Sequence, residues 1–179
     1  MNAFLKDFIK DLIIALAIVV AITIVIKPTI VKESSMEDTL YENNYLLVNK
    51  MAYINKDHPT RGDIVIFKSD MPKDNGRGNK LLIKRVIGVE GDTISFKDNQ
   101  VYRNGKLLTE DYICNEDPSL RSYPNGETFE VGQDEVFCMG DHRSVSLDSR
   151  SPQIGTVSED RVVGKAFVRL FPFNEICRL

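Results

Sequence analysis

The sequence contains few of the residues that build metal centres and disulfide frameworks, with three cysteines and two histidines among 179 residues. Cys114, Cys138 and Cys177 lack the close paired spacing of a zinc ribbon or a disulfide framework, so we interpret them as small core residues. His58 and His142 stand outside any spaced metal-ligand pattern. We therefore expect neither a metal nor another cofactor.

Clusters of positive charge and glycine-rich nucleotide-binding motifs are also missing. The net charge is −3 and the basic residues are scattered, so we expect no nucleic-acid partner. No Rossmann or P-loop glycine pattern accompanies the predicted strands. With 42% apolar and 27% charged residues and no low-complexity tract, the composition fits one globular domain plus an apolar N-terminal segment.

That N-terminal segment is uncharged from Leu12 to Ile26. With its neighbours it reaches the roughly 20 residues that span a bilayer, so we predict a transmembrane anchor at residues 8–31, overlapping a short tail at 1–10. Lys27-Pro28-Thr29 follows the run in place of the small residues of a signal cleavage site, so the anchor should stay uncleaved. A buried helix of a soluble protein is the alternative.

Charge does not decide the direction in which this anchor would cross the membrane. Two lysines precede the apolar run and two follow it, so the positive-inside count is tied. The four are Lys6 and Lys10, and Lys27 and Lys32.

Short apolar runs bounded by Gly, Asp, Asn and Pro fill residues 32–179 and predict a mostly β domain. Asn104-Gly105 is typical of a hairpin turn. Residues 71–79 read as a loop, and residues 111–132 as an irregular excursion from the sheet. The predicted strands are Tyr45 to Val48, Asp63 to Lys68, Leu81 to Val89, Thr93 to Lys97, Val101 to Arg103, Glu135 to Met139 and Val162 to Leu170.

Ser35 is the first candidate for chemistry because it follows the apolar run closely, which would hold a catalytic group near the membrane surface. Taken alone, a serine after a membrane helix is more often a turn or capping residue. Ser35 therefore needs a partner before it indicates catalysis.

Lys84 is the candidate partner. In a strand it shares one face with Leu82 and Val86, and if that face points inward its ammonium loses water and its pKa falls from about 10.4. A neutral lysine is a usable general base. The alternative is an edge-strand lysine whose stem packs while its charged head stays wet.

A third element is the segment 139–150, which follows a predicted strand and is dense in Gly, Asp, Ser and Arg. Ser146 could supply a hydroxyl that orients a neutral lysine amine. The segment could equally be a turn held by Asp–Arg pairs. Spacing alone leaves both readings open.

Four blocks of this sequence, in order, resemble the bacterial type I signal peptidases. With the anchor and the closing Val163-Gly164-Lys165-Ala166, the resemblance covers nearly the whole chain. The blocks are Ser35-Met36-x-x-Thr39-Leu40, Arg61-Gly62-Asp63-Ile64-Val65-Ile66-Phe67, Lys84-Arg85-Val86-Ile87-Gly88-x-x-Gly91-Asp92, and Gly140-Asp141-x-Arg143-x-x-Ser146-x-Asp148-Ser149-Arg150.

The resemblance implies a signal-peptidase-like antiparallel β domain behind one transmembrane helix. It also implies a membrane-bound serine endopeptidase that removes signal peptides from secreted preproteins. In such an enzyme Ser35 looks like the nucleophile, Lys84 the general base and Ser146 the hydroxyl that orients the lysine. Met36 and Ile83 look like the lining of shallow pockets that suit Ala-x-Ala before the cut. Structural support is implied for Arg85, Asp141, Asp148 and Arg150.

The resemblance further implies a single-pass protein of the cell membrane, with the N-terminus in the cytoplasm and the catalytic domain outside. Its partners would be preproteins with signal peptides and membrane lipid. No cofactor is implied.

Four positions depart from the family pattern. Glu33 stands where many members have Ser or Gly, and an ionised carboxylate there cannot donate to an oxyanion and would oppose its charge. The oxyanion hole would then depend on backbone amides, including that of Ser35. Asp38 replaces the usual proline, which removes a fixed φ. Leu82 stands where some relatives have Tyr, and His142 stands where the common residue is Asn.

Other functions compete with this one. A catalytically silent signal-peptidase-like membrane protein would bind exported chains without cutting them. A regulatory protein resembling the self-cleaving repressors would share the dyad, but would lack an anchor and carry a DNA-binding segment. A structural β domain tethered by its helix is the third. Within the enzyme hypothesis, His142 is the rival base.

Overall fold

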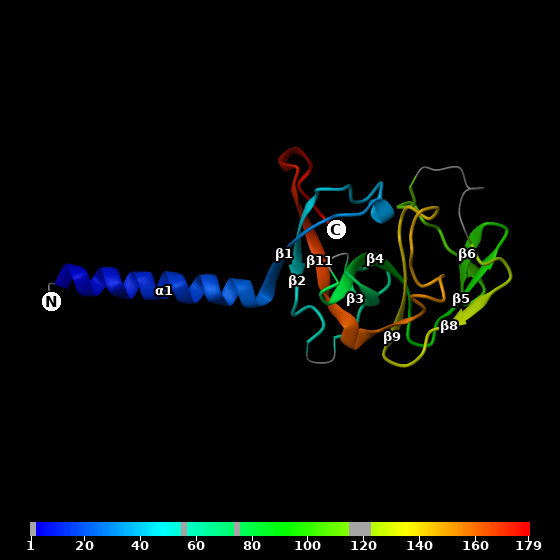
Figure 1. Ribbon diagram of the computed structural model, residues 1–179, viewed down its shortest axis with the longest axis horizontal. Coiled ribbons are helices and arrows are strands. Elements are labelled where there is room, and N and C mark those ends of the chain that lie inside the picture. Colours follow the sequence, from blue (N-terminus) through cyan, green and yellow to red (C-terminus); the bar gives the residue numbers. More distant parts are fainter. Residues whose placement is uncertain (1–2, 55–56, 74–75, 115–122) are drawn as a thin grey trace.

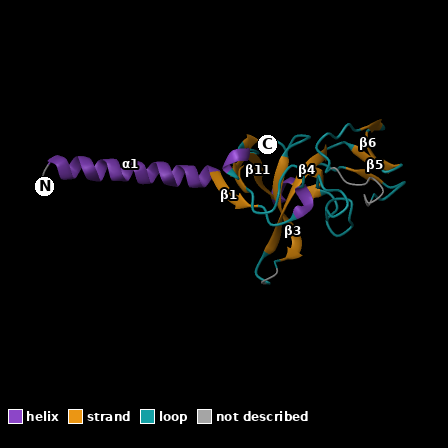
Figure 2. Ribbon diagram, turned by 90° about the horizontal axis from the view of Figure 1, so that it is seen from above, coloured by secondary structure: helices purple, strands orange, loops and turns teal. Residues whose placement is uncertain are grey.

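The computed structural model describes residues 3–54, 57–73, 76–114 and 123–179. A long helix, α1 (Ala3–Val25), projects from a β domain formed by the rest of the chain (Figure 1). The N-terminus lies at the far end of this helix. The C-terminus lies in the β domain, near the end to which the helix is joined (Figure 2).

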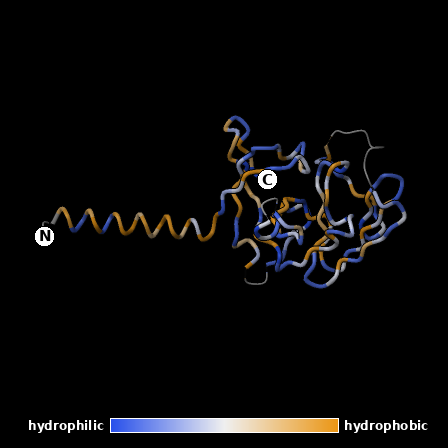
Figure 3. The backbone as a smooth tube through the Cα atoms, viewed as in Figure 1, coloured by the Kyte–Doolittle hydropathy of each residue, from blue (hydrophilic) through white to orange (hydrophobic). Residues whose placement is uncertain are grey.

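Helix α1 is apolar along its length (Figure 3). The stretch Phe4–Val25 is long and apolar enough to cross a membrane, and none of its most apolar window is buried against the rest of the structure. An apolar helix belongs either in a protein core or in lipid. Because α1 is exposed, it does not fit the alternative prediction of a helix buried in the core of a soluble protein.

The helix lies earlier in the chain than the anchor range predicted at 8–31. It ends at Val25, and Ile26–Ile30 form strand β1, which pairs antiparallel with β2 (Tyr45–Asn49). Strand β1 is the edge of the main sheet, where Pro28 is tolerated because its missing N–H need not bond a neighbour. Pairing with β2 thus takes the last residues of the predicted range into the sheet.

The main sheet has the order β1-β2-β11-β3-β4-β9-β10, with β12 also pairing with β11. All of these pairings are antiparallel. Its further members are β3 (Ile64–Pro72), β4 (Asn79–Val89), β9 (Glu135–Met139), β10 (Val157–Ser158), β11 (Val162–Phe171) and β12 (Cys177–Arg178).

Both faces of β3 are covered by apolar side chains, which explains its unbroken apolar run. Ile64 and Ile66 belong to one cluster with Met36 and Leu40, so the chain after β1 packs on that face. Val65 and Phe67 belong to a second cluster on the other face, together with Leu82, Val86 and Cys138. The candidate Ser35 and Lys84 therefore stand next to residues of two separate cores.

A smaller antiparallel sheet lies at the end of the domain away from the helix (Figure 1). At its hairpin, Asn104 and Gly105 have φ of 53° and 75°, as a type I′ turn requires. Phe96 and Phe137 pack this sheet against β9 in a third cluster. Its order is β7 (Lys106–Leu107), β6 (Gln100–Arg103), β5 (Thr93–Lys97) and β8 (Thr128–Glu130).

The mostly β, antiparallel fold class predicted from the sequence is confirmed, and each predicted strand is present. The unpredicted β7, β8, β10 and β12 are only two or three residues long, so their periodicity is too short to detect. The predicted loop at 71–79 overlaps the ends of β3 and β4. The predicted excursion at 111–132 contains β8, and its residues 115–122 lie outside the described part.

Candidate active site

Ser35 lies in a short 3-10 turn, Ser34–Met36, between the edge strand β1 and the core. The next residue, Met36, is buried, and Leu40 accompanies it in the same apolar cluster, which fixes the turn against the sheet. The backbone carbonyl of Ser35 accepts a 3.2 Å hydrogen bond from the N–H of His142. Ser35 is thus held between the core and the segment 139–150.

Lys84 lies in the middle of β4, and its side chain is fully buried. It shares its strand face with Leu82 and Val86, as the alternation predicts, and both of these pack in the second cluster. Its Nζ lies 2.6 Å from the Oγ of Ser35. Among the described lysines of the main sheet, Lys84 is the one whose side chain is buried, and its amine is in hydrogen-bond contact with the hydroxyl of Ser35.

Burial lowers the pKa of Lys84 from its ordinary value, because a charged ammonium loses its water there. The carboxylates of Asp148 and Glu33 act in the opposite direction, whereas the guanidinium of Arg150 adds to the lowering. The net direction is downward, which favours the neutral amine. A neutral amine can accept the proton of a hydroxyl at this distance.

The segment after β9 is built around the buried carboxylate of Asp148. This carboxylate accepts hydrogen bonds from the N–H of Gly140 at 2.9 Å and from Arg150 Nε at 2.8 Å. Burial alone would raise the pKa of Asp148, but the hydrogen bonds and charge of Arg150 outweigh it and lower that pKa. Arg150 also donates to the carbonyls of Arg143 and Ser146, which closes the loop on itself.

Ser146 lies in this loop against Gly140, where its hydroxyl is buried. A Cβ at Gly140 would collide with both the Ser146 hydroxyl and the carbonyl of Ser35, so all three meet at one point. In the part of the chain described here the Ser146 Oγ makes no hydrogen bond of good geometry, although it lies near enough to Asp148 to help lower the pKa of that carboxyl. Its role in orienting Lys84 remains a prediction.

Arg85 and Asp141 join β4 to the same loop through two parallel hydrogen bonds, of 2.7 and 2.9 Å. Asp141 is fully buried and also accepts from Thr39 Oγ1 at 2.5 Å. The guanidinium of Arg85 stacks 4.2 Å from the ring centre of Tyr112. This network connects three parts of the site: the turn that contains Ser35, strand β4 with Lys84, and the loop after β9.

A second buried network was not identified from the sequence. Arg143 is fully buried and its guanidinium donates to Glu110 at 2.6 and 3.0 Å and to Tyr123 at 2.9 Å. It also donates to the carbonyl of Gly140 at 2.9 Å. Glu110 lies far away in the sequence, in a polar stretch without periodicity, so no local signal pairs it with Arg143.

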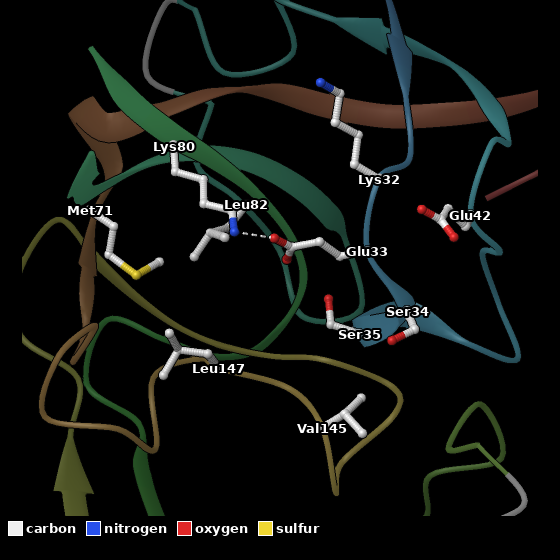
Figure 4. Close-up of a pocket in the computed structure, with 10 residues that line it drawn as sticks. All are labelled: Lys32, Glu33, Ser34, Ser35, Glu42, Met71, Lys80, Leu82, Val145 and Leu147. Atoms are coloured by element: carbon white, nitrogen blue, oxygen red, sulfur yellow. Dashed lines mark ion pairs between the residues drawn. The ribbon is translucent and has the colours of Figure 1, made fainter. Parts of the chain in front are cut away.

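Two cavities meet at Ser35. The first, of about 490 Å³, is drawn in Figure 4, with the Glu33–Lys80 pair on one side of Ser35 and Val145 on another. The second, of about 650 Å³, runs between the chain at 27–36 and strand β4. Met36 and Ile83 both line this second cavity. Its other apolar lining residues are Pro28, Ile30, Val31, Ile66 and Leu81.

Glu33 and Lys80 form an ion pair with 2.5 Å between Oε1 and Nζ. Lys80 was not singled out from the sequence, although strand alternation places it on the face of Leu82 and Lys84. The pair lines both cavities, as Ser35 does. The departure at position 33 is therefore accompanied by a cation on the neighbouring strand.

His142, the rival base, lies next to the serine turn. Its Nδ1 is 3.2 Å from the carboxylate of Glu37 and 3.3 Å from the carbonyl of Ser34. The amine of Lys84 is the group that the structure brings to 2.6 Å from Ser35 Oγ.

One group of described side chains could hold a metal ion by distance alone. His58, Asp134 and Glu159 offer ligand atoms within 4.8 Å of one another. His58 and Asp134 are exposed, and the imidazole already pairs with Glu159 at 2.7 Å. This surface group does not include any residue of the Ser35 site.

A matching family model and similar bacterial proteins agree with one another. The family model described as signal peptidase, peptidase S26, matches residues 5–171. Signal peptidase I T of Bacillus subtilis (strain 168) is 38% identical over 157 residues, which is 84% of this chain and 76% of that protein. Signal peptidase I of Bacillus licheniformis is 34% identical over 179 residues, which is 96% of this chain and 91% of that one. A crystal structure of a signal peptidase I from Enterococcus faecalis V583 is 29% identical, covering 60% of this chain and 95% of that chain with a TM-score of 0.45.

Proposed function

Since the chain belongs to the signal peptidase family, peptidase S26, and is a serine endopeptidase of the signal peptidase I type, we propose that it cleaves preproteins with Ser35 as nucleophile and Lys84 as general base. The observation that carries the proposal is the 2.6 Å contact between Lys84 Nζ and Ser35 Oγ in a site where the lysine is fully buried. Removal of signal peptides is the activity that the family membership supports.

In the proposed reaction, neutral Lys84 takes the proton of Ser35 and the oxygen attacks the scissile carbonyl. The carbonyl oxygen becomes an oxyanion, which backbone amides including that of Ser35 would stabilise. Collapse breaks the C–N bond, and the ammonium of Lys84 returns the proton to the leaving amine. Lys84 then takes a proton from a water molecule, whose oxygen attacks the acyl carbon. Collapse breaks the bond from this carbon to Ser35 Oγ, and the ammonium of Lys84 returns the proton to Ser35.

The surrounding ion pairs would hold these two groups in place. Arg85 and Asp141 tie strand β4 to the loop, and Asp148 and Arg150 fix the loop itself. Ser146 would orient the Lys84 amine through its buried hydroxyl. Since the backbone N–H of His142 in this loop donates to the carbonyl of Ser35, a small displacement of the loop would change the distance between Ser35 and Lys84.

The second cavity is the proposed substrate groove. Its walls come from the chain at 27–36 and from β4, so an extended peptide fits between them. Met36 and Ile83 would line shallow apolar pockets for small side chains, which suits Ala-x-Ala before the cut. Discrimination of this kind amounts to about 1–3 kcal/mol for each methylene.

Helix α1 is the proposed membrane anchor, because it is apolar, exposed and long enough to span a bilayer. It runs directly into β1, so the Ser35 site would lie near the lipid surface (Figure 1). By family resemblance, the N-terminus would face the cytoplasm and the β domain the outside. The partners would then be exported preproteins and membrane lipid.

The catalytically silent binding protein considered from the sequence rested on Glu33, whose carboxylate does line the site, but it disagrees with membership of a peptidase family. Incubation of detergent-solubilised protein with an Ala-x-Ala preprotein separates the two functions. We expect cleavage by the natural chain and none by Ser35→Ala, with the product N-terminus determined by mass spectrometry. Ser95→Ala, on β5 of the small sheet, is the matched control and should cleave normally. Equal cleavage by Ser35→Ala would remove Ser35 from the mechanism.

A further inference from the structure

The Glu33–Lys80 ion pair spans the point where the two cavities meet. Glu33 belongs to the chain after β1 and Lys80 to strand β4, and both residues line both cavities, as Ser35 does. Figure 4 shows the carboxylate of Glu33 directed toward the ammonium of Lys80, with Ser35 close by. The two side chains are 40% and 35% exposed, so a substrate in the groove would cover them.

A carboxylate at this place opposes the proposed reaction in two ways. Attack by Ser35 puts negative charge on the substrate carbonyl oxygen, which the charge of Glu33 would repel. The same negative charge favours the protonated form of Lys84 and so acts against a neutral base. An isolated Glu33 would therefore slow both proton transfer and formation of the oxyanion.

Lys80 is placed to compensate this charge without replacing the base. It occupies the same strand face as Lys84, but the buried side chain of Leu82 separates the two lysines. Its Nζ lies 2.5 Å from Glu33 Oε1, whereas Lys84 Nζ lies 2.6 Å from Ser35 Oγ. Lys80 and Lys84, both on β4, thus contact two different residues of the chain after β1, Glu33 and Ser35.

We propose that Lys80 is a positioning residue of this protease, whose ammonium holds the carboxylate of Glu33 and cancels its charge beside Ser35. This inference rests on the serine–lysine chemistry proposed above and adds to it a second lysine. It explains how this chain can carry a glutamate at a position where many family members have Ser or Gly.

The other charged groups that act on Lys84 do not compensate the charge of Glu33. Asp148 also acts on Lys84, but its carboxylate is already paired with Arg150 in the buried loop. Cys138 acts on Lys84 as well, but burial keeps its thiol uncharged by raising its pKa. Lys27, Lys32, Glu42 and Lys73 are further charged groups that line one or both cavities. Glu33 is the carboxylate near Lys84 that lies open to the groove, and Lys80 is its ion-pair partner.

The test is the pH dependence of kcat and KM for a peptide with Ala-x-Ala, using detergent-solubilised full-length chain. Lys80→Met leaves the charge of Glu33 uncompensated, so we expect kcat at neutral pH to fall about tenfold. The acid limb of the kcat/KM profile should move to higher pH, because Lys84 would lose its proton less readily. A purely structural role of Lys80 would alter the melting temperature without moving this limb.

Two further variants complete the test. Glu33→Gln combined with Lys80→Met removes both charges, and should recover most of the lost kcat and return the acid limb toward its original position. Lys80→Arg keeps the cation and should keep the profile. An unchanged acid limb in Lys80→Met would overturn the inference, as would faster cleavage, which would mean that the pair obstructs the groove. Loss of Ser35 without effect on cleavage would instead overturn the serine–lysine mechanism itself.

Discussion

Lys84 Nζ lies 2.6 Å from Ser35 Oγ, although 49 positions separate the two residues in the chain. The sheet produces this contact, because β4 carries the lysine in its buried centre while the turn after β1 packs on the neighbouring core. An amine held away from water beside a hydroxyl has the arrangement that a general base needs.

Replacement of Lys84 by Ala should lower kcat for an Ala-x-Ala peptide by about 10³-fold or more, because among the described residues the Lys84 amine is the base in contact with the Ser35 hydroxyl. His142→Ala should retain most of the activity, since the hydrogen bond from position 142 to Ser35 is made by the backbone N–H. Steady-state cleavage by the two purified variants decides between them. If the histidine variant were inactive and the alanine at 84 tolerated, the base would be misassigned.

The lowered pKa of Lys84 also predicts that the buried amine needed for activity reduces the stability of the fold at neutral pH. The unfolded chain keeps lysine protonated up to about pH 10.4, while the folded chain releases this proton at lower pH. The natural protein should therefore gain stability as pH rises through this window, by about 1.4 kcal/mol for each unit of pKa depression.

Lys84→Met removes this titration while preserving an apolar side chain of similar length. The variant should be inactive, yet more stable than the natural protein at pH 7, and the difference should shrink as the pH approaches about 10.4. Thermal unfolding in detergent at several pH values measures it. A difference that stayed constant with pH would show that Lys84 titrates alike in both states.

How much of this site can be predicted from sequence depends on the range of each interaction. Alternation places Lys84 on one face with Leu82 and Val86, a local pattern, but it leaves open whether that face is buried. The contact of Lys84 with Ser35 was anticipated only through the family resemblance. The Glu33–Lys80 pair was missed because it joins two segments that meet only in the folded sheet.

The same distinction applies to the fold. The long strands carry their own periodicity, and the prediction found each of them. Strand β1 was instead assigned to the anchor, because IKPTI continues an apolar run and only its partner β2 makes it a strand. Tertiary pairing, which a single segment does not encode, decided that boundary.

Gly140 should be required for an intact site, because an added Cβ would collide with the carbonyl of Ser35 and the hydroxyl of Ser146. Gly140→Ala is expected to cost about 1–3 kcal/mol of stability and to displace Ser35 from Lys84, which lowers kcat more than it changes KM. Melting temperature and cleavage kinetics measure the two effects. Gly132→Ala is the control, because its Cβ would meet only the flexible end of Glu135, at 3.0 Å. Equal kinetics for both variants would contradict this view of the site.

The boundary between anchor and domain can be tested with two truncated chains, one beginning at Ile26 and one at Lys32. The first keeps β1, which pairs with β2 from Ile26 to Ile30, and loses only a helix that is exposed along its length. The second also loses Val31, which is buried in the first cluster, and its burial alone is worth about 2 kcal/mol. It leaves β2, still paired with β11, as the new edge of the sheet, and it removes residues 27–31 from one wall of the substrate groove.

We therefore expect the chain from Ile26 to remain folded and to cleave a soluble Ala-x-Ala peptide. The chain from Lys32 should melt at a lower temperature and show a raised KM, because the peptide would lose its contacts with residues 27–31. Circular dichroism melting and peptide cleavage compare the two. Equal melting temperatures would mean that β1 contributes nothing to the domain, so that residues 26–31 serve the anchor alone. A lower temperature for the chain from Lys32 would instead place the physical end of the anchor at Val25, where the helix stops and the sheet begins.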